Sequence, residues 1–146
     1  MGWKKDSRHG LPARGYGEEA FRHLLGSEAQ RSRRSGHLCQ ILLVHFMNAE
    51  EAIVPMGSRV ADAVIAALIR TLRDTDYVGW YREGKIVGGV LTLLGQEAVS
   101  KGCACIRARV AEVLQSELKP YGHHRVRINV CTPDADNLRE IDEMWS

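Results

Sequence analysis

The sequence of 146 residues has no apolar run long enough to cross a membrane. Its longest apolar runs cover residues 41–44 and 86–94, whereas a membrane-spanning helix needs about 20 consecutive apolar residues. The first ten residues, MGWKKDSRHG, also lack the apolar segment of a signal peptide. We therefore expect no membrane insertion and no signal peptide.

A strong excess of charge of one sign is also absent. The formal net charge is +2, and 26% of the residues are charged. Nucleic-acid-binding domains usually carry a pronounced basic patch, so we expect no nucleic acid as partner. The length and the 45% of hydrophobic residues fit one ordinary globular domain with a single core.

No two cysteines form a CxxC pair; the four are Cys39, Cys103, Cys105 and Cys131. Cys39 and Cys131 lie in expected strands, where cysteine usually acts as a small buried hydrophobe. Cys103 and Cys105 are two residues apart on an expected helix, so they diverge by about 200° and cannot face one metal ion. We predict no metal site and no cofactor, and a reducing cytoplasm as the location.

The centre of the chain, residues 76–94, consists of two apolar and aromatic runs joined by a polar turn. This pattern predicts a β-hairpin, with Gly84 at a position that favours positive φ. Trp80 and Tyr81 precede the turn and point to opposite faces of a strand. Together with the basic turn they are candidates for an interaction surface, because tryptophan, tyrosine and arginine are enriched at interaction hot spots.

The remaining pattern places further elements on both sides of this hairpin. Apolar residues at helical spacing predict helices over residues 18–34, 58–73 and 96–118, and strands are expected over 38–46 and 124–131. Between them, residues 47–56 are expected to form a loop with a short, irregular helical segment. A helix followed by the order βαββαβ predicts an α+β fold (an α/β sandwich) of the ferredoxin-like type. Its antiparallel sheet would carry both crossover helices on one face.

The two ends of the chain differ from the middle. Residues 1–17 are polar and rich in glycine, which predicts a flexible arm. The expected domain covers residues 18–133. Residues 134–146 form an acidic tail, in which Leu138, Ile141 and Trp145 have the spacing of a short docking helix.

Several motifs occur at spacings typical of one family. The strand ILLVHF is followed by Gly57 and Asp62, then by the sequence RDTD over residues 73–76 and by REGKI over residues 82–86. Over residues 18–133 this arrangement resembles the GGDEF domain of bacterial diguanylate cyclases, with REGKI at the place of the GGDEF signature. The resemblance implies the same ferredoxin-like sheet, which nucleotidyl cyclase domains share.

The sequence departs from the family at the positions that carry the chemistry. In the family, two glycines of the signature admit the nucleotide, and acidic residues of the signature and of the first strand hold a divalent metal. Here Arg82 and Glu83 replace the glycines, Gly84 and Lys85 replace the acidic pair, Ile86 ends the motif, and His45 replaces the strand aspartate. Because phosphoryl transfer relies on metal electrostatics, the resemblance implies a degenerate domain without catalytic residues, and not an enzyme.

One pair of the family is retained. Arg73 and Asp76 match the RxxD motif, which in the family binds cyclic di-GMP at a product-inhibition site. An arginine fork suits a phosphate or a guanine edge. Asp76 can equally begin a strand and pair locally with Arg73, and such a surface salt bridge contributes little.

Three functions follow as expectations. The first is a catalytically inactive, bacterial GGDEF-like regulatory domain whose hairpin and basic helix end contact another protein or a second copy. The second is a receptor that binds cyclic di-GMP through Arg73 and Asp76. The least favoured is an enzyme with altered chemistry at His45, Glu83 or Lys85.

Overall fold

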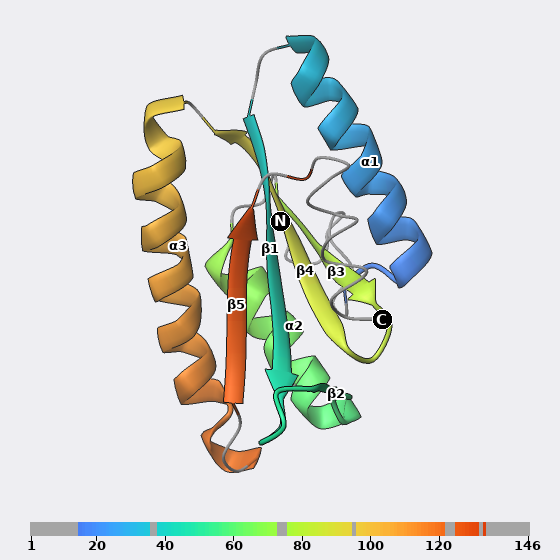
Figure 1. Cartoon of the computed structure of the whole chain (residues 1–146), viewed down its shortest axis with the longest axis vertical. Coiled ribbons are helices and arrows are strands. Elements are labelled where there is room, and N and C mark those ends of the chain that lie inside the picture. Colours follow the sequence, from blue (N-terminus) through green and yellow to red (C-terminus); the bar gives the residue numbers. More distant parts are fainter. Residues whose placement is uncertain are drawn as a thin grey trace.

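The computed structural model describes residues 15–35, 38–72, 76–94, 96–121, 125–131 and 133. The chain forms a five-stranded antiparallel sheet with helices on both faces (Figure 1). The helices are α1 (Glu18–Ser35), α2 (Ser58–Thr71) and α3 (Gln96–Glu117), with a short 3₁₀ helix, η1 (Lys119–Tyr121). The strands are β1 (Leu38–Met47), β2 (Ile53–Val54), β3 (Tyr77–Arg82), β4 (Ile86–Leu94) and β5 (Arg125–Cys131).

The sheet has the connectivity that the sequence predicts. β1 lies between β4 and β5, and β3 pairs with the outer edge of β4. All pairs are antiparallel, so two crossovers, through α2 and α3, flank the β3–β4 hairpin. This is the ferredoxin-like arrangement with an additional N-terminal helix, and the predicted α+β fold is confirmed.

Two apolar clusters cover the two faces of the sheet. On one face α2 and α3 pack over alternate residues of β1 and β4, such as Leu42, Val44 and Leu91. On the other face Phe21 and Leu25 of α1 pack in a second cluster with strand residues such as Leu43. Because both faces are covered, β1 is apolar over nearly its whole length, as a central strand requires.

The segment after β1 differs from the prediction of a short helical segment. Residues 48–52 form a turn, and Ile53–Val54 pair with Phe46 and Met47 as β2. The turn is closed by the side chain of Asn48, whose Oδ1 accepts hydrogen bonds from the backbone N–H groups of Glu50 (2.9 Å) and Ala52 (3.0 Å). An asparagine that bonds its own turn in this way competes with helix formation.

The predicted boundary of the N-terminal arm at residue 17 also needs correction. Tyr16 forms a parallel bridge with Gly79: its N–H donates to Val78 O (3.0 Å), and the N–H of Trp80 donates to Tyr16 O (2.9 Å). Residues 15–17 therefore belong to the domain and cover the edge of β3. The predicted arm over residues 1–14 and the tail over residues 134–146 lie outside the described residues. Over the described ranges no helix has the length and hydropathy of a membrane span.

Candidate functional site

The candidate site is the hairpin tip, residues 83–85, which joins β3 to β4. Gly84 has φ +79°, so the prediction of positive φ is confirmed. The N–H of Lys85 donates to Arg82 O (3.0 Å) and closes the turn. The N–H of Met56 donates to Gly84 O (2.8 Å), which fixes the segment after β2 to the tip. Glu83 and Lys85 are exposed, whereas Arg82 and Gly84 are half-buried and Ile86 belongs to the second cluster.

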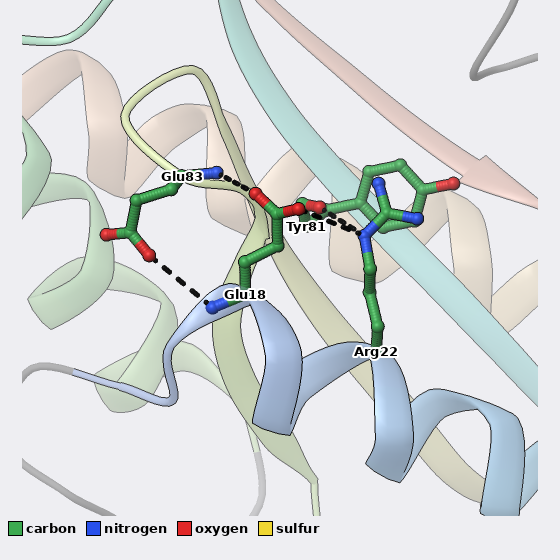
Figure 2. A network of polar contacts seen from close by, with 4 residues as sticks. All are labelled: Glu18, Arg22, Tyr81 and Glu83. Carbon is green, nitrogen blue, oxygen red and sulfur yellow. Dashed lines mark hydrogen bonds and ion pairs between the residues drawn. The ribbon is translucent and has the colours of Figure 1, made fainter.

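The N-terminus of α1 meets this tip through two glutamates. Glu18 Oε1 accepts a hydrogen bond from the backbone N–H of Glu83 (2.7 Å), and Glu83 Oε1 accepts one from the backbone N–H of Glu18 (3.4 Å) (Figure 2). A carboxylate at a helix N-terminus is favoured by the helix dipole and by the N–H groups that the first turn leaves unpaired. The reciprocal pair, called here the glutamate clasp, therefore joins α1 to the tip.

Arg22 extends this joint by one helical turn. Its Nε donates to Tyr81 O (2.9 Å), and its guanidinium lies 4.2 Å from the centre of the Tyr81 ring (Figure 2). The same Nε lies 3.7 Å from Glu18 Oε2. A cation over an aromatic face is attractive, so Arg22 holds α1 and the end of β3 together.

A surface pocket of about 850 Å³ lies beside the clasp. Its lining comes from the first turns of α1, with Tyr16 before them and Glu83 of the tip. Three carboxylates line it, those of Glu18, Glu19 and Glu83. In the part of the chain that the structure describes, however, no three histidine, cysteine or acidic side chains are arranged to hold a metal ion.

His45 stands near the end of β1, one residue beyond Val44, which pairs with Val87 at the start of β4. It therefore lies at the base of the hairpin tip. The side chain is 1% exposed. Burial, and secondarily the charge of Arg127 opposite it on β5, lower the pKa of His45 to about 4. At neutral pH the position is therefore occupied by an uncharged imidazole.

Asp76 lies at the other end of β3, so the two predicted sites are separate. It is 3% exposed, and its Oδ1 accepts a hydrogen bond from the backbone N–H of Thr92 (3.1 Å). The six residues of β3 place it about 20 Å from the tip. Arg73, its predicted partner, lies outside the described residues.

The two aromatic candidates for an interaction surface differ in exposure. Tyr81 is 1% exposed because α1 covers its face of the sheet, so its ring is not available to a partner. Trp80 points to the opposite face, where it is half-buried beside the cluster of α2 and α3. The accessible side chains of the tip are instead those of Glu83 and Lys85.

Glu18 and Arg22 belong to the site although their sequence pattern did not reveal it. They have the i, i+4 spacing of a helical ion pair at the start of a predicted helix. That spacing indicates an exposed helix face and gives no information about a partner 65 residues away.

The architecture is similar to that of several solved bacterial domains. No family model matches the sequence, and no curated protein matches it. A structure of a DGC protein from Thermotoga maritima has a TM-score of 0.62 and 15% identity, with 92% of this chain and 98% of that chain covered. Diguanylate cyclase SiaD from Pseudomonas aeruginosa, solved in complex with its activator SiaC, has a TM-score of 0.54 and 14% identity. That similarity covers 95% of this chain and 56% of that chain.

A third similar structure contains a ligand. It is the GGDEF domain of DgcB from Caulobacter crescentus in complex with c-di-GMP, with a TM-score of 0.52, 11% identity, and coverage of 86% of this chain and 78% of that chain. At such low identity the similarity establishes the fold and leaves the chemistry of the site to its own residues.

Proposed function

Since the chain folds as a GGDEF-like domain, we propose that it is a catalytically inactive regulatory domain of bacterial signalling that acts by binding a protein. The observation that carries the proposal is the glutamate clasp. The tip that would hold a nucleotide in a cyclase bonds instead to the chain's own helix α1, through Glu18 and Glu83.

The charges at the tip support the absence of catalysis. Lys85 stands where the resemblance requires an acidic metal ligand, and it is exposed. His45 stands at the position of the second acidic ligand, buried and with its pKa lowered to about 4. Neither side chain supplies a negative charge to Mg²⁺ at neutral pH, and oxygen ligands are what Mg²⁺ prefers.

Protein binding is favoured by the form of the tip. The turn is held by Met56 on one side and by α1 on the other, so it presents Glu83 and Lys85 from a fixed backbone. A preformed surface loses little entropy on association. A solved neighbour, SiaD, is bound to a protein activator. For this chain we propose a protein partner, or a second copy, at the tip in a reducing bacterial cytoplasm.

Two experiments test this function. The first incubates the protein with GTP and Mg²⁺ or Mn²⁺; we expect no cyclic di-GMP, and turnover above a no-enzyme control would refute inactivity. The second captures partners with the Lys85→Glu protein and with the Lys119→Glu protein, whose change lies at an exposed residue of η1. A partner that uses the tip is lost only with Lys85→Glu, and capture unaffected by Lys85→Glu would place the contact elsewhere. Sedimentation of the same two variants tests a homodimer.

The alternative is a cyclic di-GMP receptor that uses Arg73 and Asp76. It is favoured by the retained motif and by the c-di-GMP bound to the similar domain of DgcB. The burial of Asp76 and its bond to Thr92 give this carboxylate a structural role as well. Calorimetric titration with cyclic di-GMP distinguishes the two functions. Binding by the unmodified protein that is lost in Arg73→Ala supports the receptor. The absence of binding heat in both proteins would refute the receptor and favour protein binding.

A further inference from the structure

The strand β5 presents a basic face on the side of the sheet where α1 lies. Arg125, Arg127 and Asn129 are exposed and alternate with half-buried Val126, Ile128 and Val130, which pack against the cluster of α2 and α3. Asn129 pairs with Leu43, a residue of the cluster that α1 covers, so the exposed residues face the α1 side. The main packing partners of α1 are β3 and β1, and Figure 1 shows β5 at the other edge of the sheet.

This face is not purely polar. Met47, Ile53 and Cys131 are half-buried, and Ile53 and Cys131 pack against the cluster of α1. Cys131 lies at one end of β5, whereas Met47 pairs with Arg125 at the other end and with Ile53 of β2. Arginine stems add apolar surface between these ends. The face therefore offers apolar contacts along its length and positive charge above them.

The described polar contacts leave much of this positive charge available. Arg125 donates to the backbone carbonyl of Asn48 (3.1 Å), and Arg127 lies 3.9 Å from a carboxylate oxygen of Glu51. The side chains of Arg127 and Glu51 are 55% and 67% exposed, and ion pairs of such exposure contribute little. Arg33 and Arg34, exposed at the end of α1, add charge at the end of the sheet where β1 begins.

The sequence that follows β5 has the complementary properties. After the buried Pro133 come thirteen residues, 134–146, with one basic and five acidic residues: Asp134, Asp136, Arg139, Glu140, Asp142 and Glu143. Leu138, Ile141 and Trp145 would share one face of a helix. From Leu138 to Trp145 a helix would span about 10 Å, and the seven residues of β5 span about 23 Å, so after reversing direction the segment can return along about half of the strand.

We propose that residues 134–146 of the same chain fold back and dock on the basic face of β5. The apolar stripe of the segment contacts Cys131 and the apolar stems of the arginines on the adjoining half of the face, and its carboxylates lie beside Arg127 and toward Arg125. This interaction is separate from the hairpin tip, so it does not depend on the proposed function. The docked segment would cover the solvent-exposed face of the edge strand β5 and restrict the access of other molecules to that face.

Hydrogen exchange of the full-length protein, followed by mass spectrometry, tests the docking. We expect the amides of residues 138–145 to exchange at least about tenfold more slowly than in an unstructured peptide, independently of protein concentration. The Arg125→Glu/Arg127→Glu protein should lose this protection. So should Glu140→Lys/Glu143→Lys, which changes no residue of the described strands. The matched control is Arg107→Glu/Arg109→Glu, at exposed residues of α3, which should retain it.

Each other outcome overturns the proposal. Fast exchange of residues 138–145 in the unmodified protein would show that the segment does not dock. If protection of residues 138–145 persists in Glu140→Lys/Glu143→Lys or in Arg125→Glu/Arg127→Glu, the segment does not dock on the basic face of β5. Loss in the α3 control would indicate a general effect of charge, and protection that grows with protein concentration would assign the face to a second copy of the chain.

Discussion

The ring of Phe21 fills the space above Gly88 that a side chain would occupy. A β-carbon at position 88 would lie 2.7 Å from Cζ and 2.8 Å from Cε2 of Phe21. Gly79 pairs with Gly88 on the neighbouring strand, and a β-carbon there would lie 2.9 Å from the same ring and 2.6 Å from Tyr16 O. The two glycines thus form the depression on which the first turn of α1 rests. This close approach positions Glu18 and Arg22 at the hairpin.

Gly88→Ala is therefore expected to destabilise the domain. Phe21 is fully buried, so its ring can yield only by displacing its neighbours in the core, and overpacking of this kind costs about 1–3 kcal/mol. Urea unfolding followed by circular dichroism measures the change. The control is Gly26→Ala in α1, where a β-carbon meets nothing within 4 Å; it should stabilise by about 0.5–1 kcal/mol. Equal stability of the Gly88→Ala and unmodified proteins would contradict the packing described here.

Arg22→Ala should weaken the joint between α1 and β3. The change removes a hydrogen bond to Tyr81 O and a cation above the Tyr81 ring, and at this partly exposed position we expect a loss of about 1 kcal/mol. Arg22→Lys should recover only part of it, because lysine keeps the charge and lacks the planar fork. Chemical unfolding of both proteins, with Arg107→Ala on the exposed face of α3 as control, gives the comparison. Full recovery by lysine would mean that charge alone matters.

The sheet could be predicted from the sequence because the patterns that indicate its strands and its turn are local. The alternation of β5, the apolar run of β1 and the turn at Gly84 each follow from spacing or from one residue's backbone preference, and all three occur as expected. The order of these elements then restricts the topology to few solutions.

The errors concern contacts between residues distant in the chain. Trp80 and Tyr81 were both kept as candidates for an interaction surface, because alternation places them on opposite faces of the strand and does not show which face is covered. Here α1 covers the second face. The clasp between Glu18 and Glu83 joins positions 65 residues apart, so no local pattern contains it. β2 depends on the side chain of Asn48, whose turn resembles a helix start in the sequence.

The cysteines should differ strongly in reactivity. Burial, with the nearby charges of Glu28 and Asp76, raises the pKa of Cys39 to about 11, so its thiolate fraction at pH 8 is about 0.001. Cys105 is exposed and should react with iodoacetamide at least about a hundredfold faster. Mass spectrometry with fragmentation of the labelled peptides separates Cys105 from Cys103 and measures the rates at Cys39 and Cys105. Cys105→Ser should remove the fast signal at position 105 while Cys39 stays slow. Comparable rates for Cys39 and Cys105 in the native protein would refute the burial of Cys39.

Stability should fall as the pH is lowered below 6.5, and His45 should be a main cause. In the folded protein the pKa of His45 is lowered from 6.5 to about 4 by burial first and by Arg127 second. Above pH 6.5 both the folded and the unfolded chain carry a neutral imidazole, so the group has no effect. Below it the unfolded chain binds the proton first, and the free energy of unfolding decreases until about pH 4. Between pH 7.5 and pH 5 this amounts to about 2 kcal/mol.

Urea unfolding at pH 7.5 and pH 5 tests this assignment. In His45→Gln the group is absent, so the difference in unfolding free energy between the two pH values should shrink by about 2 kcal/mol, whatever the variant's stability at pH 7.5. The control is His23→Gln, the same replacement at an exposed position of α1. Arg127→Gln removes the secondary cause and should reduce the difference in part. If the unfolding free energies of His45→Gln and the unmodified protein depend on pH identically, the pKa of His45 is not lowered by folding and its imidazole is not buried as described.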